Sequence, residues 1–285
     1  MPGAVSRSLR SPRVLVALGL ILCIACCAAF APLIAPHDPA DQNLLSILLP
    51  PAWASGGDPA FPLGTDSLGR CVLSRLIYGA RTAMTVAVFA SLGAMLIGSF
   101  LALISGYFGG AIDWIIGRAV DVWMSFPPVI LSLILMFGLG TGLDKVVLAI
   151  ILVDWTRFCR VLRSEVMIVT RRDYVAAARL LGFTHRQTLI REVLPATVPL
   201  LITLVSLEMA IAVVVEAILS FVGLGVRSDQ AAWGQMIADA RQYVYQSPSN
   251  LLLPILAIFV AVAAFNLLGD GLRRTLDVRL AEIGR

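Results

Sequence analysis

Four acidic side chains lie in or beside long apolar stretches, where a charge is unusual enough to imply chemistry. They are Asp121, Asp154, Glu208 and Glu216. A charge at the centre of a bilayer costs about 2.5–3.5 kcal/mol on insertion scales, so such residues serve a pathway, an ion pair or a boundary. Glu208 and Glu216 are separated by about two helical turns, which places them on the same side of one helix. They either line a translocation path or hydrogen-bond to a neighbouring helix.

The other two acids are expected near helix ends. Asp154 is placed to form an ion pair with Arg157 or Arg160, about one or two turns further along the same helix. Asp121 follows an apolar run and precedes a pair of prolines. We keep Asp121, with the two glutamates, as a candidate for lining a path through the membrane.

The pattern of residues does not favour catalysis. His37 and His185 are the only histidines, and the five cysteines do not combine with them at zinc-ligand spacing. No serine or cysteine has a base and an orienting partner placed to activate it. The glycines between 138 and 142 could suit a phosphate, but Lys145 follows an aspartate and not the glycine that a P-loop requires. We therefore expect a turn there, no metal site, no enzyme activity and no ATP hydrolysis by this chain.

The composition indicates an integral membrane protein. Of the 285 residues, 59% are hydrophobic and 14% are charged, and the mean hydropathy is +0.89. These values lie outside the range of soluble domains. A hydrocarbon core of about 30 Å requires about 20 apolar residues in a helix. We predict an all-α polytopic protein with six transmembrane helices, at about 14–35, 83–104, 115–139, 146–155, 198–219 and 251–268.

Prolines and small residues predict local features of these spans. Pro127 and Pro128 lie within the third span, where they predict a kink or a broken helix. Gly93, Gly98 and several alanines in the second span would let neighbouring helices approach closely. A short turn at 105–110 should connect the second span to the third.

The distribution of arginines predicts the orientation. Between residues 157 and 192 there are eight arginines and three acids, so the positive-inside rule places this segment in the cytoplasm. Counting spans in both directions then puts both termini in the cytoplasm and the loops 36–78 and 220–250 outside. A cleaved signal peptide is the alternative for the first span, because Ala29-Phe30-Ala31 imitates a cleavage site. We favour an uncleaved span because its apolar run exceeds the roughly 7–15 residues of a signal-peptide core.

The polar segment 171–195 has the capping residues of two short helices, which we expect to be set at an angle. Asp173 is placed to cap a helix with the body Tyr174–Leu181, and Gly182 is the residue that ends it. Thr184–Gln187 has the pattern of a capping box, which starts a second helix, and the proline at the end of the segment marks a new element. We interpret this segment as the point where the protein meets a partner.

The spacing in this segment resembles the E-A-A-x-x-x-G…L-P signature of membrane subunits of binding-protein-dependent ABC importers. The matching residues are Ala176-Ala177-Ala178, Gly182 and Leu194-Pro195, while Ala176 replaces the usual leading glutamate and Glu192 stands where the signature has isoleucine. In that family the segment is a coupling helix, here about 173–193, that docks on the ATPase. Small alanines permit close approach and flanking arginines suit an acidic partner. The coupling residues that the resemblance implies are Tyr174, Val175, Ala176, Ala177, Ala178, Arg179, Leu181, Gly182 and Pro195.

Longer motifs resemble the C-type permeases of dipeptide, oligopeptide and nickel importers. They are L-G-T-D-S-L-G-R-C-V-L-S-R-L-I-Y-G-A-R at 63–81, A-V-D-V-W-M-S-F-P-P at 119–128, L-S-F-V-G-L-G-V at 219–226, W-G-Q-M at 233–236 and N-L-L-G-D-G-L-R at 266–273. Cys71 stands where that family usually has aspartate. The resemblance covers about 36–280 and implies the fold of a type I ABC importer permease. Its parts would be a tail with the first transmembrane helix at 1–35, an extracytoplasmic loop at 36–79, a five-helix core at 80–270 and a cytoplasmic tail at 271–285.

The resemblance also implies a function and a set of partners. The chain would form half of the path for di- or oligopeptides in a bacterial inner membrane, with nickel, glutathione or another small solute as alternatives. Its partners would be a homologous B-type permease in a heterodimer, two ATPase subunits or domains, an extracytoplasmic solute-binding protein and the lipid bilayer, with no nucleic acid. ATP and Mg²⁺ would bind to the ATPases, and no cofactor to this chain.

Two other classes of function compete with this one. A secondary transporter could relay protons through Glu208 and Glu216, but the sequence has no inverted repeat and no transmembrane lysine or histidine. A membrane enzyme would need a reactive group of residues that the sequence does not supply.

Overall fold

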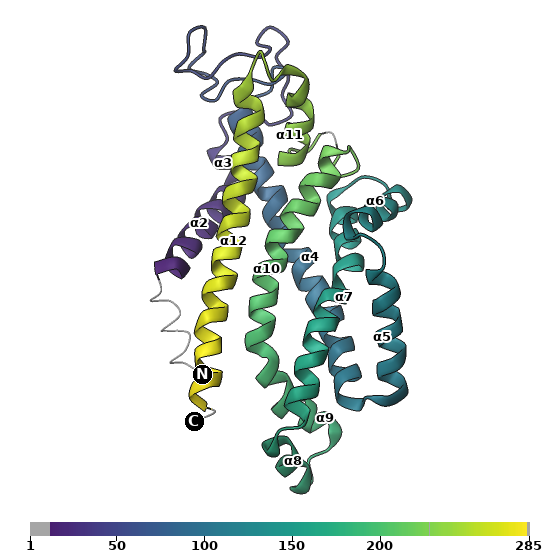
Figure 1. Ribbon diagram of the computed structural model, residues 1–285. Coiled ribbons are helices and arrows are strands. Elements are labelled where there is room, and N and C mark those ends of the chain that lie inside the picture. The colour runs from purple at the N-terminus through teal and green to yellow at the C-terminus, as the bar shows by residue number, and fades with distance from the viewer. Residues whose placement is uncertain (1–11, 228, 284–285) are drawn as a thin grey trace.

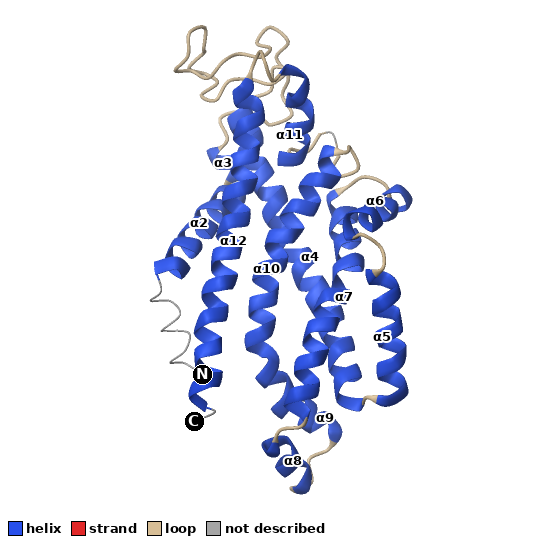
Figure 2. Ribbon diagram, in the orientation of Figure 1, coloured by secondary structure: helices blue, strands red, loops and turns tan. Residues whose placement is uncertain are grey.

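The computed structural model describes residues 12–227 and 229–283, and these form helices joined by loops, without a strand (Figure 1, Figure 2). The long helices form a bundle with distinct ends. One end carries α8 and α9, and the other carries the loop 35–71 and α11 (Figure 1). We call these the α8 end and the loop end. The elements are α2 (Pro12–Ala29), α3 (Ala31–Ile34), α4 (Val72–Phe108), α5 (Gly110–Met124), α6 (Pro128–Leu139), α7 (Leu143–Thr170), α8 (Asp173–Leu180), α9 (His185–Thr188), the π-helical turn η1 (Leu189–Val193), α10 (Leu194–Phe221), α11 (Trp233–Ala240), the 3₁₀ turn η2 (Arg241–Tyr243) and α12 (Pro248–Ile283).

Several described helices are long and apolar enough to cross a membrane. Four satisfy this by length and composition: α2, α4, the continuous run from α9 to α10, and α12 as far as Arg273. The pair α5 and α6 makes a fifth if the two count as one bent span. With 28 residues, α7 is also long enough to cross, but it is less apolar because its second half carries several charged side chains. The described residues therefore contain four or five apolar candidate spans.

The predicted break in the third span is confirmed. The axes of α5 and α6 differ by 88°, and α6 begins at Pro128, where the missing N–H of proline costs no helical hydrogen bond. The break lies against α7, because the Trp123 indole donates a hydrogen bond of 2.6 Å to the carbonyl of Leu152. The glycine turn predicted between 138 and 142 is confirmed as well, since α6 ends at Leu139 and α7 begins at Leu143.

Other predicted boundaries are wrong, because hydropathy marks only the apolar part of a helix. The polar ends of α4 and α7 remain helical well beyond 83–104 and 146–155. The helix α4 replaces most of the turn expected at 105–110, and the chain reverses at Gly109 and Gly110, whose φ angles are 65° and 58°. The loop predicted at 36–78 ends at residue 71, the segment 220–250 contains α11, and the first predicted span is interrupted at Phe30.

Close packing between α4 and α7 forms the centre of the bundle. A methyl group added at Gly98 would collide with the α7 backbone at Trp155, and one added at Gly93 would collide with the side chain of Ile151. These glycines let the two helices approach, as the small residues of the second span predict. Phe158 and Leu162 of α7 are fully buried in the resulting core.

Candidate functional site

The α8 helix ends in a well-defined capping motif. Gly182 has a φ of 90°, its N–H donates to the carbonyl of Arg179 at 3.0 Å, and the N–H of Phe183 donates to the carbonyl of Ala178 at 3.1 Å. These are the two hydrogen bonds of a Schellman motif, which satisfies the last carbonyls of the helix. The prediction that Gly182 ends the helix is confirmed.

The segment that follows is also capped as predicted. The Thr184 hydroxyl accepts from the N–H of Gln187 at 3.3 Å, and the Gln187 side chain accepts from the N–H of Thr184 at 2.9 Å, which completes a capping box. The helix that starts here is not a separate short one, however. It runs from α9 through η1 into α10, and Pro195 lies just after the π-helical turn, where the helical hydrogen bonding is already irregular.

The predicted role of Asp173 is wrong. The N-cap of α8 is Arg172, which makes no side-chain hydrogen bond, and Asp173 is the first helical residue. Its carboxylate still favours the helix, because the first turn carries the positive end of the helix dipole.

The α8 helix has a buried side and an exposed side. Val175 and Ala178 pack inward, whereas the leucines at 180 and 181 are 90% and 81% exposed. Partial burial of its hydroxyl raises the pKa of Tyr174 above its ordinary value. Of the predicted coupling residues, Tyr174, Ala176, Ala177, Arg179, Leu181 and Gly182 are exposed, Pro195 is half-buried, and Val175 and Ala178 are buried.

Tyr107 and His185, for which the sequence predicted no role at this site, connect α8 to the bundle through the predicted coupling residue Arg179. The Arg179 guanidinium lies over the Tyr107 ring, 5.0 Å from its centroid. The Tyr107 hydroxyl is 3.1 Å from Nδ1 of His185. Tyr107 is in the last turn of α4 and His185 is the first residue of α9, so the three side chains join α8, α4 and the start of the α10 run. Leu180 also escaped prediction, although an apolar residue in a polar segment is a signal that could have identified it.

The acids at membrane depth make different contacts. Glu208 is 2% exposed and accepts from Nη1 of Arg157 at 2.9 Å, which joins α10 to α7. Asp154 lies 3.6 Å from Nη2 of the same arginine, as predicted. Glu216 is buried and accepts from the Ser220 hydroxyl at 2.6 Å within its own helix.

The prediction that Glu208 and Glu216 share one side of a helix is wrong. Eight residues at about 100° each leave them about 80° apart around the axis. The two carboxylates therefore meet different neighbours, and only Glu208 contacts an arginine of the described residues.

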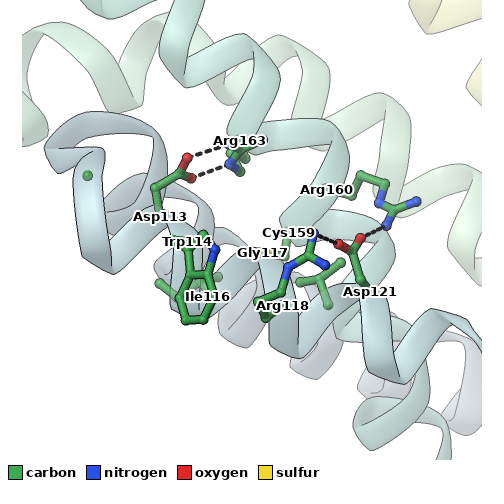
Figure 3. Close-up of a pocket in the computed structure, with 11 residues that line it drawn as sticks. Asp113, Trp114, Ile116, Gly117, Arg118, Asp121, Cys159, Arg160 and Arg163 are labelled. Atoms are coloured by element: carbon green, nitrogen blue, oxygen red, sulfur yellow. Dashed lines mark hydrogen bonds and ion pairs between the residues drawn. The ribbon is translucent and has the colours of Figure 1, made fainter.

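A charged cavity of about 420 Å³ lies between α5 and α7 (Figure 3). At one end Arg163 binds both carboxylate oxygens of Asp113, with 2.5 Å between Nη2 and Oδ2, and the Ser105 hydroxyl donates to the same carboxylate. At the other end Asp121 accepts from Nη2 of Arg118 and from Nη2 of Arg160, each at 2.6 Å. Figure 3 shows these two groups along the same cavity wall, with Cys159 between them.

Several charged side chains that line this cavity are exposed, which limits what this side of the protein can contact. The side chains of Arg118, Arg160 and Asp121 are 63%, 51% and 42% exposed. A charged group at membrane depth faces water or protein, because contact with the hydrocarbon is too costly. This side of α5 and α7 therefore turns toward water or toward another chain. The arginines at 157, 160 and 163 recur every three residues along α7, and that spacing was a usable signal for one charged helix face.

The arrangement contains no evident metal centre within residues 12–227 and 229–283, where no three His, Cys, Asp or Glu side chains gather at ligand distances. Asp113 and Asp121 contact arginines in the cavity, and the buried acids Asp154, Glu208 and Glu216 lie outside it. What the cavity offers is a row of paired charges that water or a polar solute can contact.

The fold and these sites define a class: a polytopic helical membrane protein with a charged, water-compatible face and a helical segment presented at one end. Residues 72–282 match the family described as "Binding-protein-dependent transport system inner membrane component", and residues 3–51 match "N-terminal TM domain of oligopeptide transport permease C". The chain belongs to the binding-protein-dependent transport system inner membrane component family.

Three transport proteins are similar to this chain over most of their length. A dipeptide transport system permease protein of Haemophilus influenzae is 37% identical over 268 residues, 94% of this chain and 91% of the relative. A di/tripeptide transport system permease protein of Pseudomonas aeruginosa is 38% identical over 260 residues, 91% and 86% of the two chains. A nickel transport system permease protein of Escherichia coli is 38% identical over 245 residues, 86% of each.

Proposed function

We propose that this chain is the C-type permease subunit of an ABC importer and forms half of the translocation path for di- or oligopeptides. The observation that carries the proposal is the α8 segment. A Schellman motif ends α8, a capping box starts the helix that follows, and Leu180 and Leu181 are exposed beyond the bundle. An apolar surface of this kind on a rigid, short helix suits a groove on a partner, here the ATPase.

The proposed topology has six spans with both termini in the cytoplasm. The five candidate spans become six when α7 is included, because its arginines lie on the face that turns away from lipid. In this arrangement the α8 end, with its arginines, is cytoplasmic. Residues 1–35 are the tail and first span, 36–79 the extracytoplasmic loop with about the first two turns of α4, 80–270 the five-helix core and 271–285 the cytoplasmic tail of a protein of the bacterial inner membrane.

The proposed partners are a homologous B-type permease, two ATPase subunits or domains and an extracytoplasmic solute-binding protein. ATP and Mg²⁺ would bind to the ATPases. Closure of the ATPases would move α8, and the movement would pass along two routes that the contacts provide. One is the Tyr107–His185 contact to α4, and the other is the continuous run from α9 through η1 to α10. A π-helical turn such as η1 is a frequent site of local adjustment in a helix.

The proposed path runs along the charged side of α5 and α7, which turns toward the second permease. Asp121, between Arg118 and Arg160, would line it directly. Glu208 and Glu216, buried within the chain, would act behind the lining, with Glu208 holding α7 against α10 through Arg157. Alternating access then requires the two permeases to open this face outward to receive solute from the binding protein.

The proposed solute class rests on the relatives that transport dipeptides. Nickel is the second candidate, because the nickel permease has a similar identity to this chain. Mass spectrometry of the solute-binding protein that co-purifies with the complex would distinguish the two. A peptide ligand supports the proposal, and bound nickel without peptide contradicts the solute class.

Substitution of the exposed leucines tests the docking of α8. Replacement of Leu180 and Leu181 by Asp should abolish co-purification of the ATPase subunits while the chain remains in the membrane. The matched control is Leu45→Asp on the outer loop, where leucine is 98% exposed. Equal ATPase recovery with the α8 variant and the control would refute the proposed contact.

A further inference from the structure

A network of buried charges connects the outer loop to the bundle at the loop end. Arg75 of α4 is 2% exposed, and its Nη1 donates to Asp66 of the loop at 2.5 Å and to Asp239 of α11 at 3.3 Å. Arg70 donates to the same two carboxylates, at 2.7 Å to Asp66 and 3.0 Å to Asp239. Two guanidinium groups thus face two carboxylates. The charges balance, so the network has no need of an added ion.

Two polar atoms beside this network are buried and meet no hydrogen-bond partner among the described residues. They are Nη2 of Arg75 and Oδ1 of Asn250, which lies in α12. The orientation of the Asn250 amide is fixed, because its Nδ2 donates to the carbonyl of Thr65 at 2.8 Å. The first atom is therefore a donor and the second an acceptor. A buried polar group without a partner is unfavourable, and both groups belong to residues more than nine-tenths buried.

Both residues line the same small cavity. It has a volume of about 10 Å³, and its walls include the apolar side chains of Val72, Met236 and Ala240. A space of this size holds about one water molecule, provided that two or more polar groups face it. The cavity is too small for a solute or a lipid headgroup.

The chemistry of the two atoms selects the ligand. A ligand that satisfies both must accept a hydrogen bond from the Arg75 guanidinium and donate one to the Asn250 carbonyl oxygen. An anion such as chloride can accept but not donate, and a metal cation would be repelled by the arginine. We propose that this cavity binds one ordered water molecule, which bridges Arg75 of α4 to Asn250 of α12.

The bridge would complete a set of contacts that joins four parts of the chain. Asn250 already holds the loop through Thr65, and Arg75 holds the loop and α11 through the two aspartates. The water would add a polar connection between α4 and α12, which already share an apolar core. The loop, α4, α11 and α12 would then move as one unit at this end of the protein, whatever solute the protein carries.

A density map of the intact transport complex, at a resolution that shows ordered water, tests the site directly. We expect one water-sized density about 2.7–3.2 Å from both Nη2 of Arg75 and Oδ1 of Asn250. A cavity without density would overturn the proposal. So would an ion, recognised by replacement of chloride with bromide and the resulting anomalous signal in crystals.

A variant that fills the cavity provides a second readout. Ala240→Val adds two methyl groups at the cavity wall, and Ala238→Val on the same helix is the matched control away from it. The bridge supports the loop hydrogen bonds of Leu49 and Thr65, so hydrogen exchange at these two amides should accelerate about tenfold or more in Ala240→Val and stay unchanged in the control. Equal exchange in the two variants would contradict the bridge. If Ala240→Val does not fold, the density map of the wild-type complex alone tests the proposal.

Discussion

The turn at Gly182 provides the sharpest prediction about coupling. A φ of 90° lies in the left-handed region, which costs an L-residue roughly 1–2 kcal/mol relative to glycine. No atom lies within 4 Å of the position that a Cβ would take, so a side chain here meets no steric barrier from the rest of the protein. The cost of a substitution comes from the backbone alone. By itself it shifts the population of the capped turn by a factor of about 5–30.

Two substitutions separate this backbone effect from other causes. Gly182→Val combines the free-energy cost of the αL backbone conformation with a β-branched side chain. Gly182→Asn is the control, because asparagine tolerates the αL region. In a reconstituted importer both variants should insert and assemble, because the rest of the fold does not contact this position. The valine variant should import about fivefold less peptide per ATP hydrolysed, and the asparagine variant should stay within about twofold of wild type.

Two results would refute the reasoning. The first is unchanged peptide import per ATP in Gly182→Val, which would mean that the exact end of α8 does not matter for coupling. The second is an equal loss in the valine and asparagine variants, which would mean that the absence of a side chain matters and the φ angle does not.

Further substitutions test packing and capping, with thermal unfolding in detergent as the measurement. Arg157→Met should cost about 3 kcal/mol, the low end for a broken buried pair because the arginine is 35% exposed, and adding Glu208→Met should restore only part of it, because Asp154 still loses its contact with the arginine. Cys71 is the N-cap of α4 and makes no side-chain capping bond, so Cys71→Ser should stabilise the chain by about 0.5–2 kcal/mol relative to Cys71→Ala. Gly79→Ala should destabilise by about 1–3 kcal/mol, because its methyl group would lie 2.5 Å from the tryptophan indole of α11. Gly117→Ala, where no atom is near, should stabilise by about 0.5–1 kcal/mol.

A contrary outcome would be informative for the substitutions at Arg157, Cys71 and Gly79. A double variant of Arg157 and Glu208 as unstable as the single variant would mean that the arginine is needed for another contact. Equal stabilities of the serine and alanine variants at Cys71 would mean that the start of α4 needs no side-chain cap. Stabilisation by Gly79→Ala would show that α11 yields easily to the added methyl group.

The sequence predicted the features that depend on local rules. The break at Pro127-Pro128, the end of α8 at Gly182 and the capping box at Thr184 follow from backbone geometry that a few residues determine. Hydropathy placed most of the spans, because the apolar length of a helix is set by the bilayer. The family resemblance agreed with the match over residues 72–282.

What escaped prediction depends on contacts between distant segments. Polar residues extend α7 far past its apolar part, because its arginines find carboxylates on α5 and α10. Glu208 meets an arginine 51 residues away, which no local pattern reveals. The candidate pathway face therefore became visible only once α5 and α7 were placed side by side, and Asp121 was the one predicted member of it.

The most direct test of the central claim is uptake of a labelled dipeptide into liposomes that contain the chain with its B-type permease, ATPases and solute-binding protein. We predict uptake that requires ATP and every one of these partners, and that is lost when Leu180 and Leu181 are replaced by Asp. Uptake by the purified chain alone, driven by a proton gradient without ATP, would contradict it.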